Sequence, residues 1–160
     1  MALSLAIQPC LASDGFTLYL VRHAEKQENS KNPALTQCGK EQAKQLATLL
    51  STAKIDAIYS TSYQRTMATA SPLAKEQRLA IKNYHPQKLE QFALHLKQMK
   101  RNTLVVGHSN TTPQLTQLLT DQKIASLNES DYQVLYQVKF HGEKVSLTKF
   151  TQPHLCPIKS

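Results

Sequence analysis

An apolar run that stops at charged residues constrains this chain more than any other feature. Phe16–Val21 is short and rich in branched and aromatic side chains, and Arg22 and His23 follow it directly. Such a run is typical of a buried strand. In open parallel α/β sheets, ligands bind at the carboxyl ends of the strands, because the loops that leave the strands open a crevice there. The run therefore predicts a functional site at the end of the first strand.

His23 has the chemistry of a nucleophile that takes a phosphoryl group. A neutral imidazole is nucleophilic near neutral pH, because its ordinary pKa of about 6.5 leaves most of it unprotonated. Attack on a phosphate ester also needs cations that hold the anionic group, and the planar fork of arginine makes paired bonds to phosphate oxygens. Arg22 is adjacent to His23, so we expect the strand to end or twist at Val21 and direct both side chains at one ligand.

Four motifs occur along the chain in the order Arg22-His23-Ala24-Glu25, Leu35–Gly39 with Gln42-Ala43, Tyr59–Ala70 and Val105–Ser109. The first resembles the Arg-His-Gly-Glu signature of the histidine phosphatase superfamily, with alanine in place of the glycine. The second resembles that family's Leu-Thr-x-x-Gly-x-x-Gln-Ala helix start, the third its Ser-x-x-x-x-Arg-Thr-x-x-Thr-Ala segment, and the fourth its second histidine. The resemblance implies a phosphoglycerate-mutase-like fold, a mainly parallel α/β sheet with helices on both faces.

The resemblance also implies a two-step phosphatase reaction. His23 takes the phosphoryl group as a phosphohistidine, and water then releases phosphate. Arg22, Arg65 and His108 bind the phosphate and hold the transferring group. Because arginines and histidines supply the positive charge, neither a metal ion nor another cofactor is expected. Cysteine and histidine show no metal-ligand spacing in the sequence.

The leaving group needs a proton donor. Relatives that cleave unactivated esters place an acidic residue between Arg65 and His108, and another branch of the superfamily places Asp where this chain has Ser109. His85 and Glu90 are the candidate proton donors. This pattern favours a phosphatase over a mutase, and a substrate with a good leaving group such as a phosphoramidate or an acidic alcohol. A phosphoryl-binding module of the same fold, weak or inactive in catalysis, is the alternative.

Length and composition indicate one domain over residues 14–160. The chain has 160 residues, 41% hydrophobic and 19% charged, which is an ordinary globular composition. Short apolar runs predict strands over 55–59, 79–84 and 103–107. Apolar residues at helical spacing predict helices after Thr36, over 89–99 and through Leu115–Leu119. Alternating apolar residues over 132–140 and 145–150 predict an edge hairpin.

The formal net charge of +8 favours anionic ligands. The lysines are spread along the chain, only 6% of the residues are aromatic, and no nucleic-acid-binding module is recognisable. We therefore expect a small phosphorylated substrate, or a phosphorylated envelope sugar or protein, and no nucleic acid. The sequence does not indicate an oligomeric state.

Residues 1–13 are apolar, end in small residues and resemble the back half of a secretory signal, although no Lys or Arg precedes Arg22. The segment is too short and too interrupted to span a membrane. As a truncated signal it places the protein in the periplasm or outside the cell. As an extra strand or arm it leaves a cytoplasmic location open.

Cys38 and Cys156 bear on the same question. In an exported protein such a pair favours a disulfide, which here would join the carboxyl-terminal tail to the first helix. Two unpaired thiols are the alternative, because the sequence gives no distance between the two residues.

Overall fold

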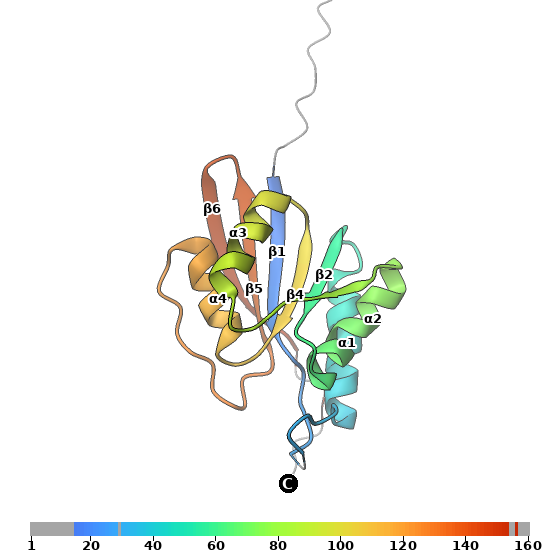
Figure 1. Cartoon of the computed structure of the whole chain (residues 1–160). Coiled ribbons are helices and arrows are strands. Elements are labelled where there is room, and N and C mark those ends of the chain that lie inside the picture. Colours follow the sequence, from blue (N-terminus) through green and yellow to red (C-terminus); the bar gives the residue numbers. More distant parts are fainter. Residues whose placement is uncertain (1–14, 29, 154–155, 157–160) are drawn as a thin grey trace, which may run out of the picture.

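Helices cover both faces of a six-stranded sheet in the computed structural model of this protein, which describes residues 15–28, 30–153 and 156 (Figure 1). The elements in chain order are β1 (Gly15–Arg22), α1 (Gln37–Leu50), β2 (Ala57–Ser60), α2 (Gln64–Gln77), β3 (Ile81–Asn83), α3 (Leu89–Met99), β4 (Thr103–Gly107), α4 (Thr111–Thr120), β5 (Val134–His141) and β6 (Lys144–Thr151). This architecture confirms the predicted fold class and the edge hairpin.

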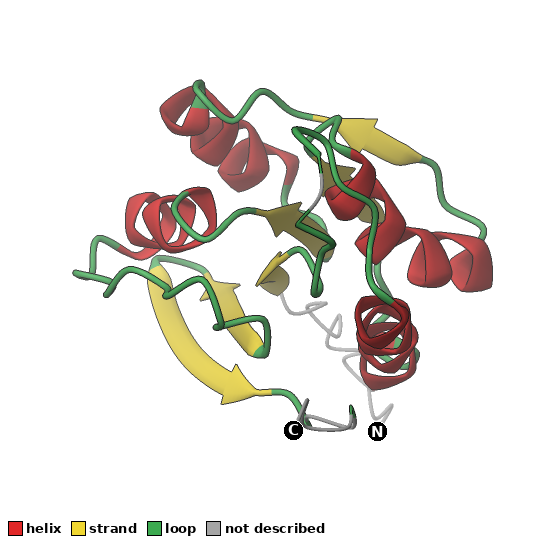
Figure 2. Cartoon of the chain, turned by 90° about the horizontal axis from the view of Figure 1, so that it is seen from below, coloured by secondary structure: helices red, strands yellow, loops and turns green. Residues whose placement is uncertain are grey.

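Parallel pairing places the carboxyl ends of four strands at one edge of the sheet. The strand order is β3-β2-β4-β1-β5-β6. β1, β4, β2 and β3 pair in parallel, whereas β5 and β6 add to the sheet as an antiparallel hairpin. Figure 2, which views the molecule from below, looks onto this edge, with helices on either side of the strands. Residues that follow β1 and β4 therefore meet at one place.

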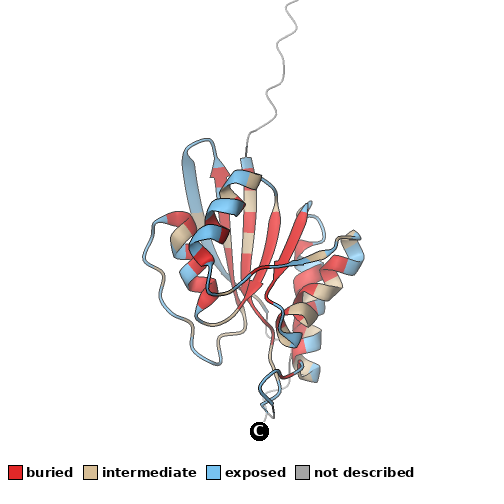
Figure 3. Ribbon diagram, viewed as in Figure 1, coloured by how far each residue is buried: buried red, intermediate tan, exposed pale blue. Residues whose placement is uncertain are grey.

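The central strands are buried on both faces, which explains the continuous apolar sequence of β1. Leu18 and Leu20 pack with residues of α3 and α4, and Val21 packs on the opposite face with residues of α1 and α2. Burying one such side chain contributes roughly 1.5–3 kcal/mol. Figure 3 shows the same contrast, with β1, β2 and β4 largely buried and the edge strand β6 exposed.

The apolar patterns predict no range for α2, but they place Arg65 on a loop or at a helix start, and the structure has it in the first turn of this helix. Two of its buried positions are threonines and its interior contains Pro72, so the apolar period is weak. The hydroxyl of Thr69 donates to the carbonyl of Arg65 at 2.7 Å, and that of Thr66 donates to the carbonyl of Tyr63 at 2.9 Å. Because threonine satisfies its own hydroxyl in this way, it can face the core.

The third predicted strand is shorter than expected. Residues 79–84 read as a strand, but only Ile81–Asn83 pairs with β2. The amide of Leu79 donates instead to the carbonyl of Ala74 at the end of α2, at 2.9 Å. The prediction for residues 1–13 lies outside the described residues. Within the described part of the chain, no helix is both long and apolar enough to cross a membrane.

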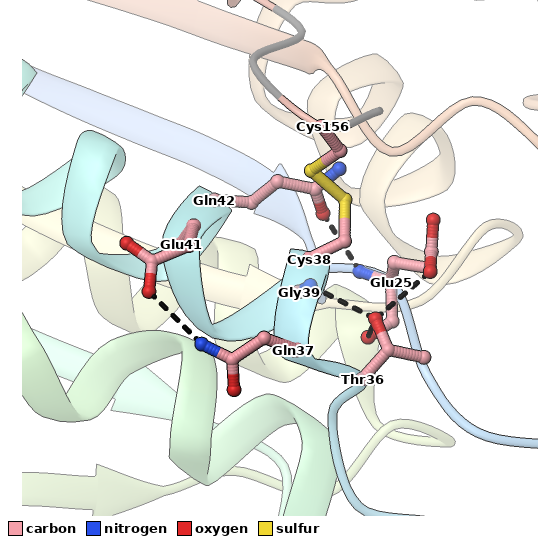
Figure 4. Close-up of a disulfide and its surroundings, with 8 residues drawn as sticks. All are labelled: Glu25, Thr36, Gln37, Cys38, Gly39, Glu41, Gln42 and Cys156. Carbon is pink, nitrogen blue, oxygen red and sulfur yellow. Dashed lines mark hydrogen bonds between the residues drawn. A yellow bond between two sulfur atoms is a disulfide. The ribbon is translucent and has the colours of Figure 1, made fainter. Parts of the chain in front are cut away.

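A disulfide joins Cys38, in the first turn of α1, to Cys156 in the carboxyl-terminal tail (Figure 4). Their Cα atoms are 5.5 Å apart, and 118 positions separate them in the sequence. The alternative of two unpaired thiols is therefore not the one that the structure adopts. The tail is also tied down where the amide of Gln152 donates to the carbonyl of Gln133 at 2.8 Å.

Replacing Cys38 and Cys156 together by serine is expected to lower the free energy of unfolding by about 2–4 kcal/mol, because a bridge over a long loop restricts the unfolded chain. Urea unfolding of the oxidised wild type and of the double variant measures the difference. Reduced wild type should show a similar loss. Equal unfolding midpoints in all three samples would contradict a stabilising bridge.

Candidate active site

His23 lies directly beyond the end of β1, where its amide donates to the carbonyl of Gly107 on β4 at 2.9 Å. Its side chain is buried, and Nδ1 lies 2.8 Å from the carbonyl oxygen of Ala24. A carbonyl oxygen only accepts, so Nδ1 carries the hydrogen and donates. Nε2 is then left with the lone pair that a nucleophile needs.

Residues of the second motif hold the backbone that follows His23 (Figure 4). Gln42 accepts from the amide of Glu25 at 2.8 Å, and the hydroxyl of Thr36 donates to the Glu25 carboxylate at 2.8 Å. Thr36 also caps α1 by accepting from the amide of Gly39 at 2.9 Å. A Cβ at Gly39 would overlap the carbonyl oxygen of Glu25, so only glycine allows this close approach. The motif thus fixes the loop between nucleophile and helix.

Arg65 and His108 come together from α2 and from the end of β4. A terminal nitrogen of Arg65 donates to Nδ1 of His108 at 3.4 Å. Because Nδ1 accepts, Nε2 of His108 carries the hydrogen and donates to the hydroxyl of Thr61 at 3.0 Å. The imidazole rings of His23 and His108 are 5.6 Å apart. The Arg65 guanidinium also lies 4.5 Å from the centre of the Tyr63 ring, a cation–π contact that supports it from one side.

Arg22 is held by the loop of residues 121–133, between α4 and β5. One terminal nitrogen donates to the carbonyls of Asn128 and Glu129, each at 2.8 Å. The other donates to the Glu129 carboxylate at 3.0 Å, and the guanidinium lies 4.2 Å from the centre of the Tyr132 ring. None of the four motifs includes Glu129 or Tyr132, and the alternating pattern places Tyr132 at the start of the edge hairpin, whereas β5 begins at Val134.

A pocket of about 380 Å³ brings these side chains together. It is lined by Arg22, His23, Lys26, Tyr63, Arg65, Pro86, Gln87, His108, Ser109, Asn110, Thr111 and Glu129. Within the described residues, the Nε atoms of Arg22 and Arg65 are buried and have no hydrogen-bond partner. Unmet, buried donors on two cations suit an anionic ligand.

The structure brings four of the six predicted site residues to this pocket, namely Arg22, His23, Arg65 and His108. His85 and Glu90 are exposed and do not line it, although Pro86 and Gln87 between them do. No cluster of three or more His, Cys, Asp or Glu side chains suited to a metal ion occurs among the residues that the structure describes.

Burial keeps both imidazoles neutral. It lowers the pKa of His23 to about 3. The hydrogen bond to Ala24 opposes this shift, whereas the positive charges of Arg22 and Arg65, and that of His108 when it is protonated, act in the same direction. Burial also lowers the pKa of His108 to about 4, with Arg65 and Arg22 contributing. Both rings are therefore unprotonated at neutral pH, which is the state required for a nucleophile.

Comparison with known proteins identifies proteins that are similar to this chain. The sequence profile of the histidine phosphatase superfamily, branch 1, matches residues 18–88, which include His23 and Arg65. Phosphoserine phosphatase 1 of Hydrogenobacter thermophilus is 41% identical over 71 residues, which cover 40% of this chain and 34% of that protein. The match thus spans about a third of the length of this relative.

Solved structures share the fold at low sequence identity. The α-ribazole phosphatase of Shigella flexneri gives a TM-score of 0.70 at 15% identity and covers 91% of this chain and 100% of its own. The protein histidine phosphatase SixA, complexed with tungstate, gives a TM-score of 0.69 at 13% identity and covers 85% of this chain and 97% of its own. A mycobacterial glucosyl-3-phosphoglycerate phosphatase gives a TM-score of 0.69 at 12% identity and covers 86% of this chain and 98% of its own.

The lowered pKa values of His23 and His108 predict that the protein loses stability as the pH falls below about 6.5, the ordinary histidine pKa. Between that value and the folded-state values of about 3 and about 4, the unfolded chain binds more protons than the folded protein. Acidification over this range therefore favours unfolding. Urea unfolding midpoints measured from about pH 7.5 to about pH 4.5 test this dependence.

His23→Ala should weaken this pH dependence, since it removes one of the two buried imidazoles. His141→Gln, at the exposed end of β5, serves as the control and should retain the wild-type dependence. A wild-type pH dependence in His23→Ala would contradict the assignment to His23.

Proposed function

This chain belongs to the histidine phosphatase superfamily, and we propose that it is a phosphatase that hydrolyses a phosphomonoester or a phosphoramidate through a phosphohistidine at His23. The profile match over residues 18–88 confirms the resemblance that the first three sequence motifs indicated, and the fourth motif, Val105–Ser109, lies outside it. The observation that carries the proposal is the state of His23. Its Nδ1 hydrogen is committed to Ala24, so the Nε2 lone pair is available in a pocket that both arginines line.

The proposed reaction has two balanced steps. First, Nε2 of His23 bonds to phosphorus while the bond from phosphorus to the leaving oxygen or nitrogen breaks, and the leaving atom takes a proton. Water then attacks phosphorus, the bond from phosphorus to Nε2 breaks, and phosphate leaves while the water gives up a proton. In both steps Arg22 and Arg65 offset the charge on the equatorial oxygens. His108, whose Nδ1 accepts from Arg65, positions that guanidinium beside the same group.

The reaction proposed here is independent of a metal ion and of any other cofactor. The cations that a phosphoryl group needs are supplied by two arginines, of which Arg22 is almost fully buried. Charge on a buried group acts more strongly than charge at an open surface. Positioning and electrostatic stabilisation then account for the catalysis.

The proposed substrate is a small phosphorylated molecule, or a phosphorylated group of an envelope sugar or protein. A pocket of about 380 Å³ suits a phosphoryl group with a small substituent. The names of the relatives point to several phosphate compounds, namely phosphoserine, α-ribazole phosphate and protein phosphohistidine. We favour a substrate with a good leaving group, because neither of the predicted proton donors, His85 and Glu90, lines the pocket.

We place the protein in an oxidising compartment such as the bacterial periplasm. The disulfide between Cys38 and Cys156 supports this placement, because reducing systems keep the thiols of most cytosolic proteins reduced. A count of reactive thiols in protein isolated without reductant tests it. Two reactive thiols at Cys38 and Cys156 would favour the cytoplasmic alternative.

The decisive experiment is to trap the phosphohistidine. Wild-type protein mixed briefly with 4-nitrophenyl phosphate in EDTA, then quenched at alkaline pH, is expected to release 4-nitrophenol and to carry one phosphoryl group on the peptide with His23. Mass spectrometry detects the adduct. His23→Ala should give neither adduct nor product, whereas His141→Gln should give both.

Three outcomes would change the assignment. Turnover that survives in folded His23→Ala would remove His23 as the nucleophile. Loss of wild-type turnover in EDTA, restored by added metal, would remove the metal-independent reaction. Absence of both product and adduct in folded wild type would favour the phosphoryl-binding module.

His85→Ala and Glu90→Gln test the two predicted proton donors. Loss of a donor is expected to slow hydrolysis of phosphoserine by roughly 10²–10⁴-fold, because its alkoxide leaving group needs a proton. Hydrolysis of 4-nitrophenyl phosphate should change little, because its leaving group is stable as an anion. Steady-state kinetics with both substrates give the comparison. A variant with wild-type rates for both would exclude that residue as the donor.

A further inference from the structure

One carboxylate lines the pocket that otherwise carries positive charge. Among the described residues, Glu129 is the only acidic side chain in the pocket wall. Its carboxylate accepts from Arg22 at 3.0 Å and from the hydroxyl of Ser109 at 3.1 Å. The Glu129 side chain is 78% exposed, whereas that of Arg22 is 1% exposed. The pair therefore connects the buried floor of the pocket to its rim.

The direction of the reaction places the leaving group at this rim. In an in-line displacement, the leaving atom lies opposite the attacking nitrogen. His23 is 2% exposed and forms the floor, so the leaving group points away from the floor and out toward solvent. Glu129 is at the exposed end of the same wall. Its charge is thus closest to whatever the substrate carries beyond the transferring phosphate.

A second hollow continues the same surface beyond Glu129. This hollow has a volume of about 700 Å³, and Glu129, Glu25, Glu28 and Tyr132 line it together with Lys26. Three carboxylates face one ammonium group there. A substituent that extends from the phosphate over the rim therefore meets net negative charge, although the chain as a whole carries +8.

We propose that Glu129 determines charge specificity, so that the enzyme disfavours substrates with a second negative charge beside the transferring phosphate and favours those with a cationic group there. This inference rests on the proposed function, since it assumes that the phosphoryl group binds at Arg22 and His23. Phosphate competes with the Glu129 carboxylate for Arg22. When phosphate occupies Arg22, the carboxylate is left facing the substrate without its partner.

Two compounds of similar size and opposite charge test the inference. Phosphoethanolamine carries an ammonium group two carbons from the phosphate oxygen, and phosphoglycolate carries a carboxylate near the same place. Both are measured as competitive inhibitors of 4-nitrophenyl phosphate hydrolysis, in wild type and in Glu129→Gln. The quantity of interest is the ratio of the two inhibition constants, because a general change in phosphate affinity cancels in it.

We expect wild type to bind phosphoethanolamine more tightly than phosphoglycolate, and Glu129→Gln to reduce that preference by about three- to tenfold, as one charge at roughly 6 Å in a wet environment would do. The change should shrink as ionic strength rises. Glu143→Gln makes the same chemical change in the turn between β5 and β6, at the opposite end of the sheet, and should keep the wild-type ratio.

A structural role alone would give a different result. If Glu129 only supports Arg22, Glu129→Gln should weaken both inhibitors equally and leave their ratio unchanged, which would overturn the inference. An equal gain in affinity for both would overturn it as well. If wild type does not hydrolyse 4-nitrophenyl phosphate, the proposed function fails, and calorimetric titration of the two compounds still measures the ratio in wild type and variant.

Discussion

The parallel pairing of β1 with β4 is the constraint on which the site depends. Its register sets Arg22 opposite Gly107, and the amide of His23 continues the pairing by donating to the Gly107 carbonyl. A Cβ at residue 107 would meet three hydroxyl oxygens at 2.8–2.9 Å, so the strand needs glycine at this end. This pairing brings His23 and His108 to one pocket, although 84 positions of chain lie between them.

The guanidinium groups of Arg22 and Arg65 are both held in place by neighbouring residues. Tyrosine rings support both guanidinium groups, Tyr132 against Arg22 and Tyr63 against Arg65. Arg22 is also held by backbone carbonyls of residues 128 and 129, which accept its hydrogens without adding a full charge. These contacts fix the guanidinium groups before a ligand arrives, so little of the binding free energy is lost in ordering them. The same positive charges help to keep the two histidines neutral.

Part of this arrangement could be predicted from local patterns. The run Phe16–Val21 indicated a buried strand, and Thr103–Gly107 agrees with the predicted range residue for residue. The extent of helix α2 could not be predicted, because its buried threonines make hydrogen bonds and give no apolar period. Glu129 could not be predicted as a site residue, because no local sequence pattern distinguishes a carboxylate that contacts a buried arginine from one that faces water.

The sequence by itself determined most of the elements that form, α2 excepted, since apolar period, caps and branched residues act over a few neighbouring positions. It also determined the chemical groups at the ends of the strands, His23 after β1 and His108 after β4. Only the tertiary structure decided which of these groups meet. Strand order and the path of residues 121–133 set Glu129 against Arg22, and the fold joined Cys38 to Cys156. The physical reason is that such contacts depend on the packing of the whole sheet and its helices, which no single segment specifies.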